Sequence, residues 1–113
     1  MIRFDQVSKF YGSVPALRDF SLEAEKGETV VLLGLSGSGK TTTLRMVNGM
    51  VTPSSGQVMV RGCDVSAWPL IDLRRSIGYV IQEVGLFPHW TVAQNVGMLP
   101  KVVEWDSKKT RQR

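Results

Sequence analysis

One segment of the chain, residues 34–42, carries the residue types and the spacing that binding of a phosphate group requires. It reads Gly-Leu-Ser-Gly-Ser-Gly-Lys-Thr-Thr and matches G-x-x-x-x-G-K-[ST] at every fixed position. Its glycines let backbone amides turn inward without a Cβ in the way, so that the amides present partial positive charge to phosphate oxygens. The alternative, a flexible Gly/Ser turn before an ordinary helix, would match this pattern by chance only rarely in 113 residues.

The side chains of this loop complete the predicted site. Lys40 would place a full positive charge at the β- and γ-phosphates of a nucleotide, and the Thr41 hydroxyl is a hard oxygen ligand suited to Mg²⁺. The predicted nucleotide-binding residues of the loop are Gly34, Ser36, Gly37, Ser38, Gly39, Lys40, Thr41 and Thr42.

The elements around the loop are those that the motif needs. Residues 29–33 are a continuous apolar run, typical of a strand buried on both faces of a parallel sheet. Residues 40–48 are predicted to form a helix with Leu44, Met46 and Val47 facing inward and Gly49 near its end. Further strands are predicted at residues 2–7, 17–25, 57–60 and 77–81, and helical segments at 70–75, after a cap at 64–66, and at 92–99. The sequence thus predicts an α/β fold of the P-loop NTPase class.

Composition and charge exclude several function classes. The chain is 42% hydrophobic and 21% charged, as in ordinary globular proteins. Its net charge of +4 is concentrated in a basic tail at about residues 101–113, with 5 Lys and Arg against 2 Asp and Glu, whereas residues 1–100 hold 9 against 8. Because no basic stripe interleaved with aromatic residues accompanies this charge, we expect no nucleic-acid partner.

The single cysteine and the apolar runs indicate a cytosolic chain. Cys63 has no second cysteine for an intramolecular disulfide and no Cys or His partners at metal-ligand spacing, and we expect it to be a small, buried or half-buried residue. No signal peptide opens the chain, and no apolar run approaches the roughly 18 residues of a membrane-spanning helix.

Beyond the loop, the chain resembles the nucleotide-binding domain of ABC transporters along nearly its whole length. The resemblance is carried by residues 7–12, 16–22 and 27–28 before the loop, and by residues 54–58, 61–62 and 73–82 after it. It implies that residues 1–113 are the N-terminal portion of a single ABC ATPase domain, from the Walker A loop to just past the Q-loop. The expected architecture is a partial RecA-like core plus an antiparallel β subdomain.

The resemblance also implies roles for individual residues. An aromatic residue at the position of Tyr11 stacks on adenine in this family, and the glutamine at the position of Gln82 contacts Mg²⁺ and the attacking water. We therefore expect Lys40 and Gln82 to be catalytic, Thr41 and Gln82 to be metal ligands, and ATP and Mg²⁺ to be the cofactors. Phe10 is the neighbouring candidate for stacking, and either aromatic could instead belong to the core. His89 is interpreted as a loop histidine rather than a base, and Arg74 and Arg75 as a solvated helix face.

Within that family, the chain resembles the ATPases of osmoprotectant uptake systems for glycine betaine, choline, carnitine or proline. Residues 76–82, 84–89, 99–101 and 105–106 carry this likeness. It implies the ATP-hydrolysing subunit of an importer, peripheral on the cytoplasmic face of the inner membrane. The expected partners are a second ATPase subunit in a homodimer, membrane permease subunits and, indirectly, an extracytoplasmic solute-binding protein.

Several family features are missing or altered, and alternatives stay open. Residues 1–113 contain no Leu-Ser-Gly-Gly-Gln signature, no Walker B acid pair and no switch histidine, so we expect a fragment that binds ATP weakly and does not turn it over by itself. Leu35 and Glu83 depart from the family's usual residue types. The alternatives are an importer ATPase for another small solute such as an amino acid, a stand-alone P-loop kinase or GTPase, and a non-catalytic binding module. An arginine-rich lid or an Asn-Lys-x-Asp sequence, which would favour a kinase or a GTPase, is not visible.

Overall fold

The computed structural model describes residues 1–83 and 85–106. The chain divides into two compact units, Met1–Ile77 and Gly78–Arg113, which are described separately below. The prediction that residues 1–113 belong to one ABC ATPase domain stays a prediction. The end of the predicted basic tail, residues 107–113, lies outside the described residues. None of the described helices is long and apolar enough to cross a membrane.

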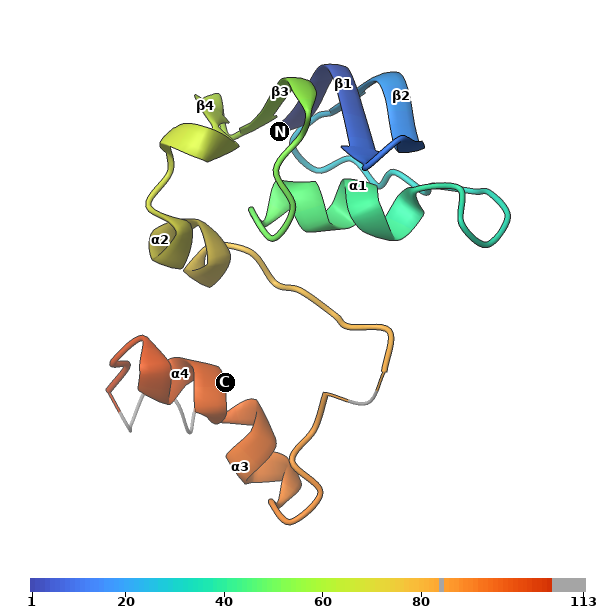
Figure 1. Cartoon of the computed structure of the whole chain (residues 1–113). Coiled ribbons are helices and arrows are strands. Elements are labelled where there is room, and N and C mark those ends of the chain that lie inside the picture. Colours follow the sequence, from blue (N-terminus) through green and yellow to red (C-terminus); the bar gives the residue numbers. More distant parts are fainter. Residues whose placement is uncertain (84, 107–113) are drawn as a thin grey trace. The chain divides into compact units, whose positions relative to one another are not determined.

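A four-stranded antiparallel sheet forms one layer of the first unit (Figure 1). Its strands are β1 (Ile2–Tyr11), β2 (Val14–Ala24), β3 (Ser55–Val60) and β4 (Cys63–Asp64), in the order β2-β1-β3-β4. The predicted strands at residues 2–7, 17–25 and 57–60 are confirmed, and β1 and β2 run further toward their shared turn than predicted. The expected antiparallel β subdomain is therefore present.

A bulge in β1 explains why its apolar residues do not alternate strictly. Phe4 pairs with Leu22, but the next pair along the strand joins Val7 and Phe20, and Gln6 between them has φ 46°. The extra residue brings Phe4 and Val7 to the same face, where 3% and 0% of their surfaces are exposed.

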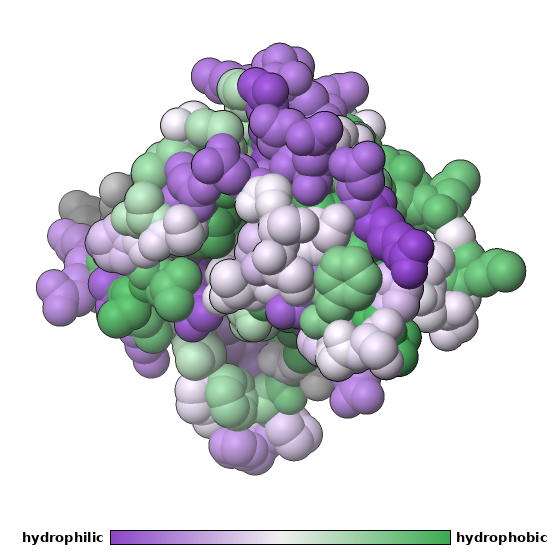
Figure 2. Space-filling view, turned by 45° about the horizontal axis from the view of Figure 1, so that its top comes forward, coloured by the Kyte–Doolittle hydropathy of each residue, from purple (hydrophilic) through white to green (hydrophobic). Residues whose placement is uncertain are grey.

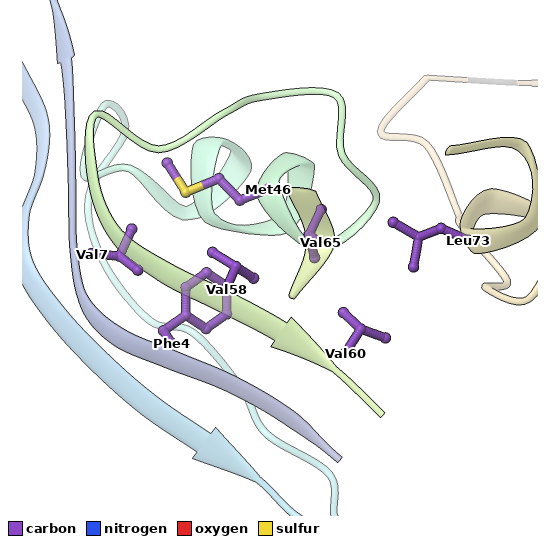
Figure 3. Close-up of a cluster of buried hydrophobic side chains, with 7 residues drawn as sticks. All are labelled: Phe4, Val7, Met46, Val58, Val60, Val65 and Leu73. Atoms are coloured by element: carbon purple, nitrogen blue, oxygen red, sulfur yellow. The ribbon is translucent and has the colours of Figure 1, made fainter. Parts of the chain in front are cut away.

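The core of the first unit lies between this sheet and helix α1 (Lys40–Val47), with the 3₁₀ helix η1 (Val65–Ala67) and helix α2 (Leu70–Arg75) at its end. Its buried hydrophobic residues, drawn in Figure 3, are Phe4, Val7, Met46, Val58, Val60, Val65 and Leu73. The predicted helices at 40–48 and 70–75 are confirmed. The predicted cap at 64–66 belongs to another helix than expected: Asp64 accepts a hydrogen bond from the Ser66 amide at 2.7 Å at the start of η1, whereas α2 begins after Pro69 without a side-chain cap.

One inward-facing residue of α1 was predicted wrongly. Met46 is fully buried and Val47 partly buried, but Leu44 is 53% exposed. Thr43 takes the buried position instead, because its hydroxyl donates to the Gly39 carbonyl oxygen at 3.0 Å and is therefore not left unsatisfied in the core.

Residues 29–33 and 77–81, both predicted as buried strands, belong to no strand in the structure. Val31, Leu33 and Val80 are 70%, 90% and 95% exposed. A strand of a parallel sheet is formed by hydrogen bonds to its neighbours, and among residues 1–83 and 85–106 no strand pairs with either segment. Figure 2 shows one face of the molecule, on which apolar residues reach the surface between hydrophilic ones.

The second unit contains two short helices, α3 (Val92–Val96) and α4 (Met98–Val102). They confirm the helical prediction for residues 92–99 and extend it, with an interruption at Gly97. Pro100 explains the interruption, because proline has no N–H to donate to the carbonyl one turn earlier and is tolerated only in the first turn of a new helix. Thr91 and Gln94 form a capping box at the start of α3.

Candidate nucleotide-binding site

The glycine-rich loop leads directly into the N-terminus of α1. Its backbone turns through positive φ angles at Gly37 (83°) and Gly39 (90°), values that side chains other than glycine rarely adopt. The Ser38 amide donates to the Leu35 carbonyl oxygen at 3.2 Å and closes a turn within the loop. The helix then begins at Lys40, as the motif predicted.

Position 39 requires a residue without a side chain for a second reason, because strand β2 passes close to it. A Cβ built on Gly39 would overlap the carbonyl oxygen of Ala16. The same approach makes Ala16 one wall of a hollow of about 140 Å³, whose other lining residues are Gly37, Ser38, Gly39, Lys40, Thr41 and Thr42. The structure thus brings six of the eight predicted loop residues together around one small concave space.

The N-terminus of α1 gives this hollow a positive potential. Gly39, at the N-cap position, provides no side chain to accept from the first helical amides, and the first turn contains no acidic residue. These amides have no carbonyl partner within the helix, and they add their partial charges to that of the helix dipole. An anion can satisfy them, which is the usual chemistry of phosphate binding at a helix N-terminus.

The Lys40 ammonium group is folded back into the loop. It donates to the carbonyl oxygens of Gly34 and Leu35, each at 2.7 Å, and to the Ser38 hydroxyl at 3.2 Å. These three contacts place a full positive charge inside the curve of the loop, beside the hollow. Phosphate oxygens entering the hollow would therefore meet both Lys40 and the helix amides.

Thr41 and Tyr11 lie in the same unit as the loop. Thr41 is an exposed residue in the first turn of α1, so its hydroxyl is accessible to a metal ion held beside phosphates. Tyr11 ends β1 and is 52% exposed, next to the hairpin turn that leads through Val14 to Ala16 on the wall of the hollow. Tyr11 is thus an exposed aromatic ring rather than a core residue, and Phe10 beside it is 40% exposed.

Gln82 lies in the second unit, in an exposed bend. Its predicted contact with Mg²⁺ and with a water molecule stays a prediction. His89, in the same unit, packs edge-on against Phe87 and Trp90 with ring centroids 6.2 and 6.0 Å apart, in keeping with its interpretation as a loop residue.

Two cationic residues have contacts that sequence reasoning missed. Arg74, predicted to be merely solvated, donates to the carbonyl oxygens of Asn48 and Gly49 at 3.1 and 3.2 Å, at the C-terminal end of α1. Lys9 donates to the Thr52 carbonyl oxygen at 2.7 Å and lies over the Tyr11 ring. Local sequence patterns could not predict these hydrogen bonds. Arg74 and Asn48 are 26 residues apart in the sequence, and Lys9 and Thr52 are 43 residues apart.

The fold of the chain is similar to that of a solved ATP-binding cassette. The chain matches a structure described as "Dimeric structure of a post-hydrolysis state of the ATP-binding cassette MJ0796 bound to ADP and Pi" with a TM-score of 0.83 and 30% sequence identity. The match covers 99% of this chain and 53% of that one.

Several transport ATP-binding proteins are also similar to the chain in sequence. The chain is 46% identical to the "Glycine betaine uptake system ATP-binding protein YehX" of Escherichia coli over 93% of its own length and 34% of the relative's. It is 43% identical to the "Glycine betaine/carnitine/choline transport ATP-binding protein OpuCA" of Bacillus subtilis, over 100% of this chain and 30% of the relative. The chain therefore spans about a third of the length of these relatives.

The family model described as "ABC transporter" matches residues 17–113, which include the glycine-rich loop, helix α1 and all of the second unit. Because this match covers most of its length, the chain belongs to the ABC transporter family.

Proposed function

We propose that the chain is the phosphate-binding part of the ATP-binding subunit of an ABC importer. The single observation that carries this proposal is the hollow at the N-terminus of α1, lined by Gly37 to Thr42 with the Lys40 ammonium group beside it. Helix amides, a full positive charge and a hydroxyl for a metal ion converge there, and a polyphosphate chain with Mg²⁺ is the ligand that uses all three.

The residue types around the hollow suit ATP and Mg²⁺. Thr41 is an exposed residue that offers one hydroxyl oxygen as a ligand, and Mg²⁺ commonly keeps several waters rather than being caged by protein. When bound, the metal neutralises charge on the β- and γ-phosphates. The half-exposed Tyr11 ring supplies a stacking surface for the base, and Gln82 would contribute a neutral amide to the metal and the attacking water.

Hydrolysis would require more than these residues. Phosphoryl transfer needs a positioned water and stabilisation of the developing charge, and residues 1–113 contain no signature sequence, Walker B acids or switch histidine. We therefore expect the 113-residue chain to bind Mg-ATP weakly and to show no meaningful turnover by itself. In an importer, the ATP hydrolase activity of this family would belong to the whole subunit.

The transported solute is proposed as an osmoprotectant of the quaternary amine type. Relatives named for glycine betaine, carnitine or choline transport share 40–46% identity with the chain. However, the "Glutamine transport ATP-binding protein GlnQ" of Geobacillus stearothermophilus is 42% identical, so an amino-acid importer is the second candidate. The partners would be a second ATPase subunit, permease subunits in the membrane and a solute-binding protein, with the chain peripheral on the cytoplasmic face.

Titration calorimetry with Mg-ATP tests the phosphate-binding part of this proposal. Lys40→Ala removes the ammonium group from the hollow and should weaken binding at least tenfold, since a charge-assisted contact to phosphate contributes roughly 1.5–3 kcal/mol. Lys26→Ala is the matched control, because Lys26 is an exposed lysine in the turn after β2 and should have no effect. Equal affinities of the Lys40→Ala and Lys26→Ala variants would contradict the proposal.

A further inference from the structure

The Lys9 ammonium group makes two contacts that the proposed phosphate chemistry does not use. Lys9 and Tyr11 are two residues apart on β1 and therefore on the same face of the strand. The Lys9 Nζ lies 5.2 Å from the centroid of the Tyr11 ring, within the range of a cation–π interaction. The same Nζ donates to the Thr52 carbonyl oxygen at 2.7 Å.

This second contact belongs to a set of hydrogen bonds that ties the end of β1 to residues 52–54. The Phe10 amide donates to the Ser54 hydroxyl at 3.1 Å, and the Ser54 amide donates to the Ser8 carbonyl oxygen at 2.8 Å. The tethered segment follows α1, the helix whose N-terminus forms the hollow. The Lys9 side chain is therefore anchored at its charged end, unlike a freely rotating surface lysine.

The Tyr11 ring needs such support if it is to stack on a base. An exposed ring at the end of a hairpin can take more than one side-chain rotamer, and each rotamer that does not face the base reduces the population competent to bind. An anchored ammonium group over one face of the ring favours a single rotamer and leaves half of the Tyr11 surface exposed.

We propose that Lys9 is a positioning residue, which holds the Tyr11 ring in the orientation that stacks on the nucleotide base. This inference rests on the proposed ATP-binding function and on the stacking role of Tyr11, and it adds the residue that orients the ring. Lys9 itself does not contact the nucleotide in this proposal.

The test compares a ligand that has a base with one that has none. Mg-ATP and Mg-tripolyphosphate are titrated against the unaltered chain and the variants Lys9→Met, Tyr11→Ala and the combination of both. Lys9→Met keeps the apolar stem and removes the charge. It should weaken Mg-ATP binding about two- to fivefold, the range for an exposed cation–π contact, and leave tripolyphosphate binding unchanged.

Two further variants separate positioning from a structural role. In the Tyr11→Ala background, Lys9→Met should have no additional effect, because the ring that it orients is gone. Lys9→Arg retains a cation and should restore most of the ATP affinity. Lys26→Met, at an exposed residue in the turn after β2, is the control for a general loss of positive charge.

The outcomes distinguish this inference from the proposed function. If Lys9→Met weakens ATP and tripolyphosphate equally, or still acts without Tyr11, Lys9 only braces the strand and the inference is wrong. If Tyr11→Ala leaves ATP affinity unchanged, the stacking role fails and the inference fails with it. If Lys40→Ala does not weaken tripolyphosphate binding, the proposed phosphate site itself is wrong.

Discussion

Replacing Gly39 by alanine is the most direct test of how the loop geometry makes the phosphate site. The substitution has two consequences that the structure separates. It places a Cβ on a residue with φ 90°, and it drives that Cβ into the carbonyl oxygen of Ala16. The first is a conformational strain within the loop, and the second forces the loop away from β2.

Gly37→Ala is the matched control, because it causes the first consequence without the second. Gly37 has φ 83°, nearly the same as Gly39, but a Cβ built there meets no atom within 4 Å. The left-handed conformation costs a residue with a Cβ about 1–2 kcal/mol. If the loop relieves this strain by leaving its binding conformation, Gly37→Ala should weaken Mg-ATP binding about five- to thirtyfold.

Gly39→Ala should weaken binding beyond that range, because the loop must also move away from the Ala16 carbonyl. The displacement would open the hollow on the side where Ala16 forms its wall. The assay is calorimetric titration of both variants with Mg-ATP and Mg-tripolyphosphate, with urea denaturation to verify that each variant is folded. Both ligands should be affected, since the defect lies at the phosphates.

Equal losses for the two variants would refute the reasoning, because the overlap with Ala16 would then have no consequence for binding. A loss confined to Mg-ATP would also contradict it, since the hollow is assigned to phosphates and not to the base. Gly62→Ala serves as a remote control: it has φ 81° in the turn between β3 and β4, with no atom within 4 Å, and should affect stability without affecting affinity.

Two other predictions concern contacts that organise the elements around the loop. Arg74→Met removes two donors from the carbonyl oxygens at the C-terminal end of α1, and should lower the free energy of unfolding by about 1 kcal/mol in urea denaturation. Asn95→Ala removes the amide that accepts from the Phe87 N–H at 2.8 Å and donates to the carbonyl oxygens of Phe87, Trp90 and Thr91. It should accelerate hydrogen exchange of the Phe87 amide at least about fivefold, because that amide loses a hydrogen bond of roughly 1 kcal/mol.

Each of these predictions has a neighbouring control. Arg75 is exposed on the same helix as Arg74, so a loss of stability in Arg75→Met as large as in Arg74→Met would mean that charge alone matters. Val96 follows Asn95 and is 70% exposed, and Val96→Ala should leave exchange of the Phe87 amide unchanged. Unaltered exchange of that amide in Asn95→Ala would show that the turn at residues 87–91 holds without the side chain of Asn95.

Much of the site could be predicted from the sequence, because its residues are local in the chain. The glycines, Lys40 and Thr41 lie within one short segment, and the phosphate-binding pattern is encoded in their spacing alone. The helix after the loop and three of the four strands of the antiparallel sheet were predicted for the same reason, since apolar periodicity and turn residues act over a few positions, whereas the two-residue strand β4 was not predicted.

Features that depend on distant segments could not be predicted in this way. The residues around Gln6 show no pattern that predicts the bulge there. This bulge places Phe4 and Val7 on the same, buried face of β1. Residues 29–33 have the apolar pattern of a buried strand, yet a strand exists only where another strand supplies hydrogen bonds, and none of the described residues does so.

The sequence by itself determined which chemistry the loop can perform, because residue types and their spacing decide what an amide, an ammonium group and a hydroxyl can bind. Only the tertiary structure decided how that chemistry is supported. It brought the Ala16 carbonyl against Gly39, the Arg74 guanidinium to the end of α1, and the Lys9 ammonium between Thr52 and the Tyr11 ring. Except for the contact of Lys9 with Tyr11, these contacts join residues that are distant in sequence, and they form only when the packing of the core has brought their segments together.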